Sequence, residues 1–260
     1  MSSDREGIRR GAEGQYLLEQ QINGLPVRAE YTRRSVEEIF LPLLRKWTKL
    51  YREKNRRIVV FLAAPPATGK STLASFLQEL SHVTPDAEPV EAVGMDGFHR
   101  FQADLKSHTV LRNGEALPMT AIKGAPVTFD LPELTQRLQR LRTEELCPWP
   151  VYDRKLHDPQ EGLITVRGGV VLVEGNYLLL DEPGWRELRG LCDDSVAIRA
   201  DAGQLRERLV CRKMCSGLSR REAETFVDRS DLQNVQLCCE KTMPANLQLR
   251  LTETGEYVPA

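Results

Sequence analysis

Hydrophobic residues along the chain occur either in short unbroken runs or at helical spacing. The run IVVFLAA, at 58–64, contains no polar residue and predicts a strand buried on both faces. KSTLASFLQEL, at 70–80, has helical spacing, and the later runs VEAVGM, GVVLVEG and DSVAIRA predict further strands. Strands that alternate with helices predict an α/β fold in three layers, with a mainly parallel sheet and helices on both of its faces.

More helices are predicted in the second half of the chain. Residues 131–142 place four leucines on one helical face. Asp201 is positioned to cap a helix that begins AGQLRERL and has a basic outer face. The segment SRREAETFVDRSDLQNVQLC is predicted to be helical again, and LQLRLTE to form the last strand.

The first 55 residues have a different pattern. A polar, glycine-bearing stretch at 1–14 is followed by a helical pattern from Tyr16 to Ile22. A second helix is predicted to begin at Ser35, which we interpret as its cap, and Pro42 predicts a kink or a late start. We therefore expect residues 1–55 to be a tail and a helical extension that packs against one domain at 56–260.

Charge and composition narrow the possible partners. The chain has 260 residues, with 36 basic residues against 37 acidic ones. This balance predicts no general attraction to nucleic acid or to a membrane surface. The N-terminus lacks the apolar core of a secretory signal, and no apolar run is long enough to span a bilayer. The six cysteines lack the spacing of a zinc site, so we expect reduced thiols in a cytoplasmic protein. With no general attraction to nucleic acid or membrane, the expected partner is a small-molecule substrate.

The first predicted strand leads into PPATGKST, which is typical of a phosphate-binding loop. Such a loop needs free backbone N–H groups, a helix N-terminus behind them and a lysine that reaches the outer phosphates. Lys70 is expected to neutralise phosphate charge, and Ser71 to offer its hydroxyl to Mg²⁺. The predicted ATP-binding residues are Pro66, Ala67, Thr68, Gly69, Lys70, Ser71 and Thr72.

Ala64 and Ala67 stand where such loops usually carry glycine. The alanine methyl group fits wherever the backbone keeps a negative φ, and we expect this at both positions. Gly69, the glycine nearest the phosphates, is present, and two prolines stiffen the loop before it. A strand, turn and helix that match the motif by chance are the alternative, which the lysine and the order of elements disfavour.

Two acidic residues follow predicted parallel strands, at the edge of the sheet where chemistry gathers. Asp96, in VGMDGFHR, is predicted to accept the proton of an attacking hydroxyl, with Phe98 and His99 facing the substrate. Glu174 ends another strand and is expected to hold Mg²⁺ or its waters. The alternative for each acid is a helix cap or a surface carboxylate.

Two polar segments are candidates for the rest of a site. WPVYDRKLHDP gathers Tyr152, Arg154 and His157, which could close over a small polyhydroxylated substrate or form an ordinary strand edge and turn. Arg208 and Arg212 lie on a basic helix, and more arginines follow a Ser-Gly turn. Such a run is either a solvated face or a lid, at about 208–221, that places guanidinium groups on a transferred phosphoryl group.

Six segments, in the order in which they occur, resemble the phosphoribulokinase/uridine kinase family of P-loop kinases. They are PPATGKSTLA, MDGFHR, KGAPVTFD, YDRKLHDP, VEGNYLLL and RLVCRK. The chain is most similar to its bacterial nucleoside/nucleotide kinase branch, some members of which are labelled fructose-transport-system kinases, and more distantly to pantothenate kinase. The resemblance implies transfer of the ATP γ-phosphoryl group to a hydroxyl, with Mg²⁺. It implies roles for Asp96 as base, Lys70, Arg208 and Arg212 in catalysis, Glu174 at the metal and substrate, and Tyr152 and His157 at the substrate.

The chain departs from uridine kinases at Lys123, because those enzymes carry an acid that grips ribose shortly before the segment corresponding to APVTFD. Lys123 is either a surface residue or a partner for an anionic group of the substrate. We therefore predict a kinase of a sugar or nucleoside-like metabolite, with a pantothenate-like anionic acceptor or a catalytically silent nucleotide-binding regulator as alternatives. No guanine-reading N-K-x-D motif supports a GTPase, and a homodimer is kept as a candidate assembly.

Overall fold

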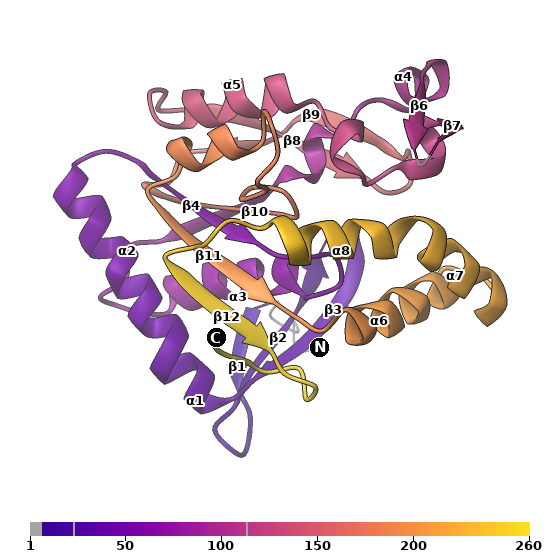
Figure 1. The fold of residues 1–260 in the computed structure, drawn as a ribbon. Coiled ribbons are helices and arrows are strands. Elements are labelled where there is room, and N and C mark those ends of the chain that lie inside the picture. Colours follow the sequence, from indigo (N-terminus) through magenta and orange to yellow (C-terminus); the bar gives the residue numbers. More distant parts are fainter. Residues whose placement is uncertain (1–6, 23, 113) are drawn as a thin grey trace, which may run out of the picture.

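The computed structural model describes residues 7–22, 24–112 and 114–260. Its centre is a six-stranded sheet with the order β13-β12-β11-β4-β10-β5, in which only β13 runs antiparallel to its neighbour (Figure 1). These strands are β4 (Ile58–Ala63), β5 (Val90–Gly94), β10 (Val170–Gly175), β11 (Asp194–Arg199), β12 (Leu247–Leu251) and β13 (Tyr257–Pro259). The predicted mainly parallel sheet is confirmed, while β13 was not anticipated.

The position of β4 at the centre of the sheet explains why its sequence has no polar residue. All six of its residues are buried, because its side chains alternate between two cores. Val60 and Leu62 point into the first core, and Val59 and Phe61 into the second. A polar side chain at any of these positions would lose its hydration without gaining a partner.

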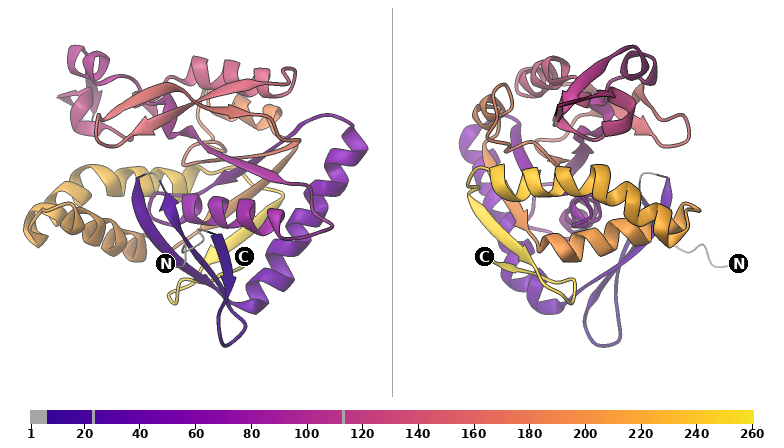
Figure 2. Two further views of the ribbon diagram at one scale, coloured as in Figure 1. Left: turned by 180° about the vertical axis from the view of Figure 1, so that it is seen from behind. Right: turned by 45° about the vertical axis from the view of Figure 1, so that its right-hand side comes forward.

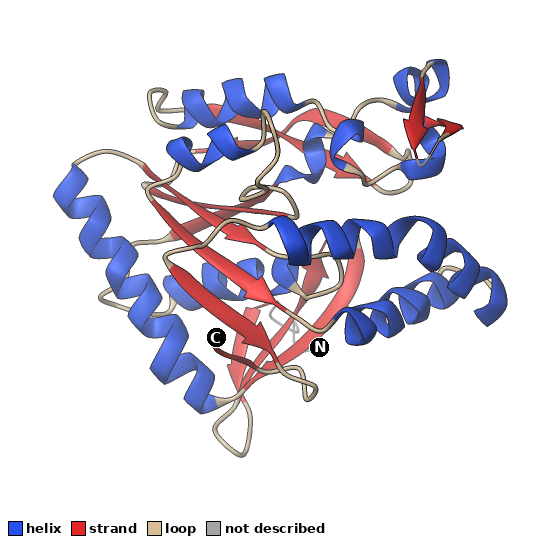
Figure 3. Ribbon diagram, in the orientation of Figure 1, coloured by secondary structure: helices blue, strands red, loops and turns tan. Residues whose placement is uncertain are grey.

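Helices cover both faces of the sheet, which confirms the three-layer α/β fold (Figure 3). The first core holds side chains of α2 (Leu41–Lys54), α3 (Lys70–His82) and α6 (Ala202–Cys215). The second core holds side chains of α5 (Leu131–Leu141) and of strand β8 (Cys147–Asp153). Asp201 caps α6 as predicted, since its side chain accepts a hydrogen bond from the Gln204 N–H.

The N-terminal segment forms an antiparallel sheet of β1 (Gly7–Arg10), β2 (Tyr16–Ile22) and β3 (Leu25–Tyr31), which lies beside α3 (Figure 2). The predicted helix at Tyr16–Ile22 is therefore wrong. Tyr16 and Leu18 are both buried, two residues apart, which is the spacing of a strand. Pairing with strands on both sides overrides the helical pattern of this short segment.

The predicted second helix is confirmed, with different details at its start. Thr32, not Ser35, caps α1 (Arg33–Ser35), because the Thr32 side chain accepts from the Ser35 N–H. A π-helical segment, Val36–Phe40, then leads into α2. Pro42 lies in the first turn of α2, where its missing N–H costs least, so the chain continues as a helix after an irregular start.

The remaining elements are short connections and one helical arm. The connections comprise α4 (Gln102–Ser107), the hairpins β6 (Thr109–Arg112)–β7 (Glu115–Pro118) and β8–β9 (Asp158–Val166), and 3₁₀ turns at Met95–Phe98, Met119–Ile122, Pro126–Thr128 and Arg186–Leu191. The arm runs from α6 through α7 (Arg220–Phe226) and a π-helical segment, Val227–Asp231, into α8 (Leu232–Lys241) (Figure 1). Within the described ranges, no helix is both long and apolar enough to cross a membrane.

Candidate functional site

The phosphate loop connects β4 to α3, as the sequence predicts. Gly69 precedes α3 with φ of 87°, and a Cβ there would lie 2.8 Å from the Tyr257 hydroxyl, so only glycine fits. Ala67 has φ of 66°, which contradicts the expectation of negative φ at this alanine. Ala64 is buried and has no positive φ, so the expectation holds there.

The carbonyl groups of the loop are held by side chains around it. Tyr257 donates to the Thr68 carbonyl at 2.8 Å, and Arg208 Nη1 lies 3.4 Å from the Ala67 carbonyl. The Thr68 hydroxyl donates to the Pro65 carbonyl at 3.0 Å. With these carbonyls engaged, the first N–H groups of α3, which have no acceptor within the helix, are available to an anion.

Glu174 lies at the end of β10, against the start of α3. The Ser71 hydroxyl donates to Glu174 Oε1 at 2.8 Å, and Lys70 Nζ lies 3.8 Å from Oε2. Burial raises the pKa of Glu174, the Asp96 carboxylate adds to this effect, and the Lys70 ammonium opposes it. Glu174 Oε2 is buried without a hydrogen bond, so this oxygen could bind a metal ion or a water molecule.

Asp96 follows β5 in the 3₁₀ turn Met95–Phe98 and is half-buried. A Cβ at the next residue, Gly97, would lie 2.0 Å from the Pro150 carbonyl. Glycine at 97 therefore allows the turn to approach β8 closely, which brings the Asp96 carboxylate beside the β8–β9 hairpin.

Two cavities meet at Asp96. The larger, of about 440 Å³, extends from Lys70 and the phosphate loop to Lys123 and the arm residue Arg212. The smaller, of about 130 Å³, lies against α3 and β5. Ser71, Asp96, Tyr152 and Arg154 line both cavities.

Aromatic and basic residues from outside the phosphate loop line part of the larger cavity. The His99 ring stacks on Phe129 at 3.9 Å and meets the Tyr152 ring edge-on at 5.1 Å. Burial lowers the pKa of His99, although the Asp96 carboxylate opposes the shift, and burial raises the pKa of Tyr152 to about 12. Both side chains can therefore serve as neutral hydrogen-bonding groups at neutral pH.

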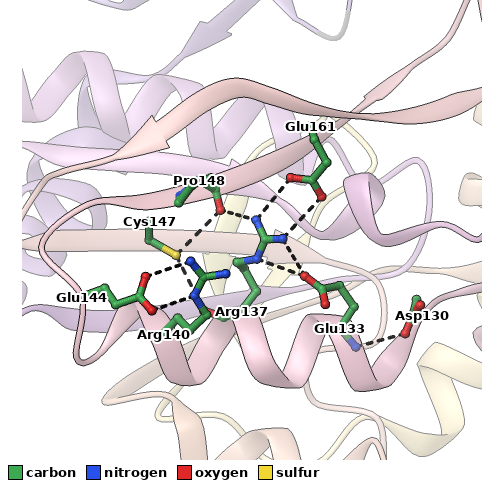
Figure 4. Close-up of polar contacts among 8 residues, drawn as sticks. All are labelled: Asp130, Glu133, Arg137, Arg140, Glu144, Cys147, Pro148 and Glu161. Carbon is green, nitrogen blue, oxygen red and sulfur yellow. Dashed lines mark hydrogen bonds and ion pairs between the residues drawn. The ribbon is translucent and has the colours of Figure 1, made fainter.

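The hairpin that carries Tyr152, Arg154 and His157 is fastened at its base by Arg137 of α5 (Figure 4). The Arg137 side chain is only 7% exposed; it donates to the Pro148 carbonyl, pairs with Glu133 at 2.6 Å and reaches Glu161 of β9 at 3.4 Å. A buried guanidinium held on several sides fixes α5 against both strands of the hairpin. The hairpin therefore has a rigid base from which its turn projects toward the cavity.

The arm brings cations to the other side of the larger cavity. Arg212 and Lys213 line it, and Lys213 is held over the Phe226 ring at 3.7 Å and 3.6 Å from Asp231. Arg206 pairs with Asp228 at 2.6 Å and joins α6 to the returning segment. The arm corresponds to the predicted helix–turn–helix; its movement as a lid stays a prediction.

The structure gathers most of the predicted site residues around the larger cavity. Its lining includes Pro66, Ala67, Lys70, Ser71, Asp96, His99, Lys123, Tyr152, Arg154, His157 and Arg212. Phe98 does not line it, because its ring is buried against Trp149 in the second core. Arg208 is not part of the lining either and instead faces the Ala67 carbonyl.

Several residues of the site were missed in the sequence. Asn176, Asn234 and Thr120 line the larger cavity, and Tyr257 supports the loop from β13. Asn176 follows Glu174 in VEGNY, so its place after a strand was a usable signal. Asn234 and Tyr257 lie on elements far along the chain, and nothing local marks them.

A metal ion would find a partial set of ligands here. Ser71 and Glu174 converge, with Asp96 close enough to affect the pKa of Glu174. The described part of the chain contains no group of three or more His, Cys, Asp or Glu side chains that could hold a metal by themselves. This arrangement suits Mg²⁺, which keeps several waters and is usually bound through few carboxylates together with substrate phosphates.

Comparisons with known proteins identify the family. No protein-family model matches the chain. It is 42% identical over 241 residues to the uncharacterized protein YggC of Escherichia coli, which covers 92% of this chain and 98% of that protein. It is 31% identical over 195 residues to "Putative uridine kinase C227.14" of Schizosaccharomyces pombe, which covers 72% of this chain and 80% of that protein.

A solved structure agrees with the relationship found in sequence. The crystal structure of a "putative fructose transport system kinase" from Silicibacter sp. TM1040 matches with a TM-score of 0.71 and 31% identity, over 80% of this chain and 98% of that one. The resemblance seen in the motifs is thereby confirmed. The chain belongs to the family of P-loop kinases that contains uridine kinases, phosphoribulokinases and pantothenate kinases.

Proposed function

We propose that the protein uses ATP with Mg²⁺ to phosphorylate a hydroxyl group of a small, hydroxylated metabolite, a sugar or a nucleoside-like compound. The observation that carries this proposal is the position of Asp96, between a phosphate loop with Lys70 and a cavity lined by unpaired polar atoms. In-line transfer needs a base on the acceptor side of the γ-phosphoryl group, and we assign this role to Asp96.

The donor half of the reaction falls to the phosphate loop. The first N–H groups of α3 and the Lys70 ammonium bind the β- and γ-phosphates, and Arg212 faces them from the arm. Ser71 and Glu174 would hold Mg²⁺, which when bound neutralises charge on the outer phosphates. The Ser71–Glu174 hydrogen bond keeps these two oxygen-bearing side chains together.

The acceptor half falls to groups around Asp96. Its carboxylate orients the attacking hydroxyl and takes its proton as the new O–P bond forms. His99 Nδ1, Asn176 Oδ1 and Asn234 Oδ1 are buried and make no hydrogen bond to other described residues. Buried polar atoms left without partners are costly, so these three atoms indicate that a ligand with several hydroxyl groups completes the site.

Replacement of the proposed base tests this function. Asp96→Asn keeps the shape of the side chain but cannot accept a proton, so we expect ATP to bind within about twofold of wild type and turnover to fall at least ~100-fold. ATP consumption is measured over pooled sugars, sugar derivatives and nucleosides, with fructose and uridine among them because two relatives carry those names. Asp86→Asn, at an exposed site paired with Arg45, is the matched control and should be fully active.

The pooled assay also separates the kinase from a silent nucleotide-binding regulator. Tight ATP binding without consumption in any pool would favour the regulator. Consumption that Asp96→Asn leaves unchanged would remove Asp96 from the mechanism. Consumption lost in Asp96→Asn and retained in Asp86→Asn is the result we expect.

A further inference from the structure

Not all of the lysine and arginine side chains that line the larger cavity have a protein carboxylate nearby or a proposed role at the nucleotide. Lys70 is close to Glu174, and Lys213 is close to Asp231. Arg212 lines the cavity from the arm, and the proposed function assigns it to the phosphates. Lys123 and Arg154 remain, and neither has a carboxylate oxygen within 4 Å among the residues that the structure describes.

Lys123 is fixed in place rather than free on the surface. Its Nζ donates to the His157 carbonyl at 2.7 Å and lies 5.0 Å from the centre of the Tyr152 ring. Burial lowers the pKa of Lys123, and the Asp158 carboxylate opposes the shift. An ammonium group has three donors, so this contact leaves two of them for a ligand in the cavity.

The backbone of the hairpin turn is arranged around this lysine. His157 has φ of 57°, an uncommon value for a residue with a Cβ, and its carbonyl is the one that accepts from Lys123. Asp153 holds the turn from its other end, since it accepts from the N–H groups of Lys155 and Leu156 at 2.7 and 3.0 Å. The left-handed backbone at His157 and the bonds to Asp153 together direct a carbonyl toward Lys123, so the turn holds this cation at the cavity.

Arg154 lies on the same turn, on the boundary of the two cavities, and makes no hydrogen bond or ion pair with other described residues. Its charge reaches several groups of the site, because it lowers the pKa of both Tyr152 and Glu174 against the burial that raises them. A guanidinium group offers five donors in a plane that match a carboxylate or a phosphate. Lys123 and Arg154 line the same cavity, and both act on the pKa of His99, so together they make a candidate anion site.

We propose that the acceptor carries an anionic group, a carboxylate or a phosphate, which Lys123 and Arg154 bind while its hydroxyl faces Asp96. This inference rests on the proposed kinase function for the place of the acceptor. It separates the protein from a kinase of neutral nucleosides, because a neutral acceptor would leave the free donors of these two cations without an anion to bind. A sugar phosphate and a sugar acid are the two chemical sources of such an anion.

Binding measurements test the anion site without requiring turnover. Ribose 5-phosphate, gluconate, ribose and glucose are each titrated calorimetrically into protein saturated with Mg²⁺ and a non-hydrolysable ATP analogue, which fills the phosphate loop. We expect binding of an anionic compound and none of its neutral counterpart. Preference for ribose 5-phosphate would identify a phosphate as the anion, and preference for gluconate a carboxylate.

Variants assign the binding to the two cations. Lys123→Gln and Arg154→Gln should each lower the affinity for the anionic compound by about 10- to 100-fold and leave the affinity for the ATP analogue unchanged. Lys123→Arg should recover part of the loss. Lys155→Gln, an exposed lysine of the same turn outside the cavity lining, should bind like wild type.

The outcomes distinguish this proposal from the proposed function. Equal binding of neutral and anionic compounds, or anion binding that survives both glutamine variants, overturns the anion site while leaving the kinase in place. A loss of kcat in Arg154→Gln without a change in acceptor KM assigns that arginine to the transferred phosphoryl group and also overturns the proposal. ATP consumption with neutral acceptors alone would likewise overturn the anion site.

Discussion

The backbone at Ala67 lies in the left-handed region, where a residue with a Cβ is strained by about 1–2 kcal/mol. Glycine at 67 would remove this strain but would also raise the entropy of the unfolded chain, at a cost of about 0.4–1 kcal/mol. We expect Ala67→Gly to leave the free energy of unfolding unchanged or to raise it by up to about 1.5 kcal/mol. Urea unfolding measures this.

Ala64 is the matched control in the same loop, because it is buried and has no positive φ. Glycine at 64 would remove a buried methyl group and raise the entropy of the unfolded chain, and there is no backbone strain at this position for it to relieve. Ala64→Gly should therefore destabilise the protein by about 1–2 kcal/mol. If both variants lose the same stability, the backbone at Ala67 is not strained. The KM for ATP, measured alongside, shows whether that strain affects nucleotide binding.

Among single residues of the site, the sequence predicts those that belong to a short motif or follow the end of a strand. Lys70 and Ser71 follow from the loop motif, and Asp96 and Glu174 from the ends of two apolar strands. The orientation of the Phe98 ring could not be predicted in this way, because a shift of one position along the 3₁₀ turn decides whether a side chain faces the cavity or the core. Side chains supplied by distant elements, such as Asn234, carry no local signal at all.

The C-terminal strand β13 supports the phosphate loop through one hydroxyl group. Tyr257 donates to the Thr68 carbonyl in a buried hydrogen bond of 2.8 Å. Tyr257→Phe would leave this carbonyl without a partner and let the loop shift, so we expect the Kd for ATP to rise about three- to tenfold. The turnover number at saturating ATP should change little, because Tyr257 touches no reacting group.

Tyr31 provides the control for this element, because it belongs to the same aromatic cluster and stacks on Tyr257 with ring centres 6.4 Å apart. Tyr31→Phe also removes one hydroxyl from the cluster, whereas the hydrogen bond to the Thr68 carbonyl comes from Tyr257. Nucleotide titration of both variants, with thermal unfolding to match their stability, separates loop support from packing. Equal ATP affinities in the two variants would contradict the role given to Tyr257.

Elements are predictable where burial on both faces or a long amphipathic face dictates them, as at β4 and α5. The strand β2 was mistaken for a helix because seven residues with mixed polarity fit either period, and only the pairing with β1 and β3 decides between them. The hairpin β8–β9 and the strand β13 pair with segments that are near in the chain, but neither short strand shows by its own pattern that it has a partner. The hydrophobic spacing within one short strand does not encode such pairings, even when the partner is the next segment of the chain.

At the scale of the whole molecule, two consecutive aspartates join the N-terminal helix α2 to the central sheet. Asp194 accepts from Lys46 and from the Trp47 indole at 2.7 and 2.8 Å. Asp193 accepts from Lys54 at 2.8 Å and from Arg56 at 2.6 Å. Residues 1–55 were expected to be an extension. The described residues of this segment share the first core with the sheet, and α2 adds the bonds to Asp194 and Asp193, so the folding of this part is tied to that of the sheet.

The bonds to Asp193 make the stability of this junction depend on pH. Burial opposes the ionisation of Asp193, but hydrogen bonds from Arg56, Lys54 and the Val59 N–H outweigh it and lower the pKa to about 2, from 3.8. A lowered pKa in the folded state adds stability that is present above about pH 4 and is lost as the pH falls toward 2. We expect Asp193→Asn to cost about 2 kcal/mol at pH 7, and this difference from wild type to vanish near pH 2.

Urea unfolding of wild type and Asp193→Asn between pH 2.5 and 7 measures this difference directly. Asp86→Asn removes a carboxylate that is also paired with an arginine, Arg45, but is 58% exposed, so screening by water should leave its stability close to wild type at every pH. A difference between wild type and Asp193→Asn that stays constant across this range would show that the side chain acts by packing alone. A difference that closes as the solution is acidified would show that ionised Asp193 holds α2 against the sheet.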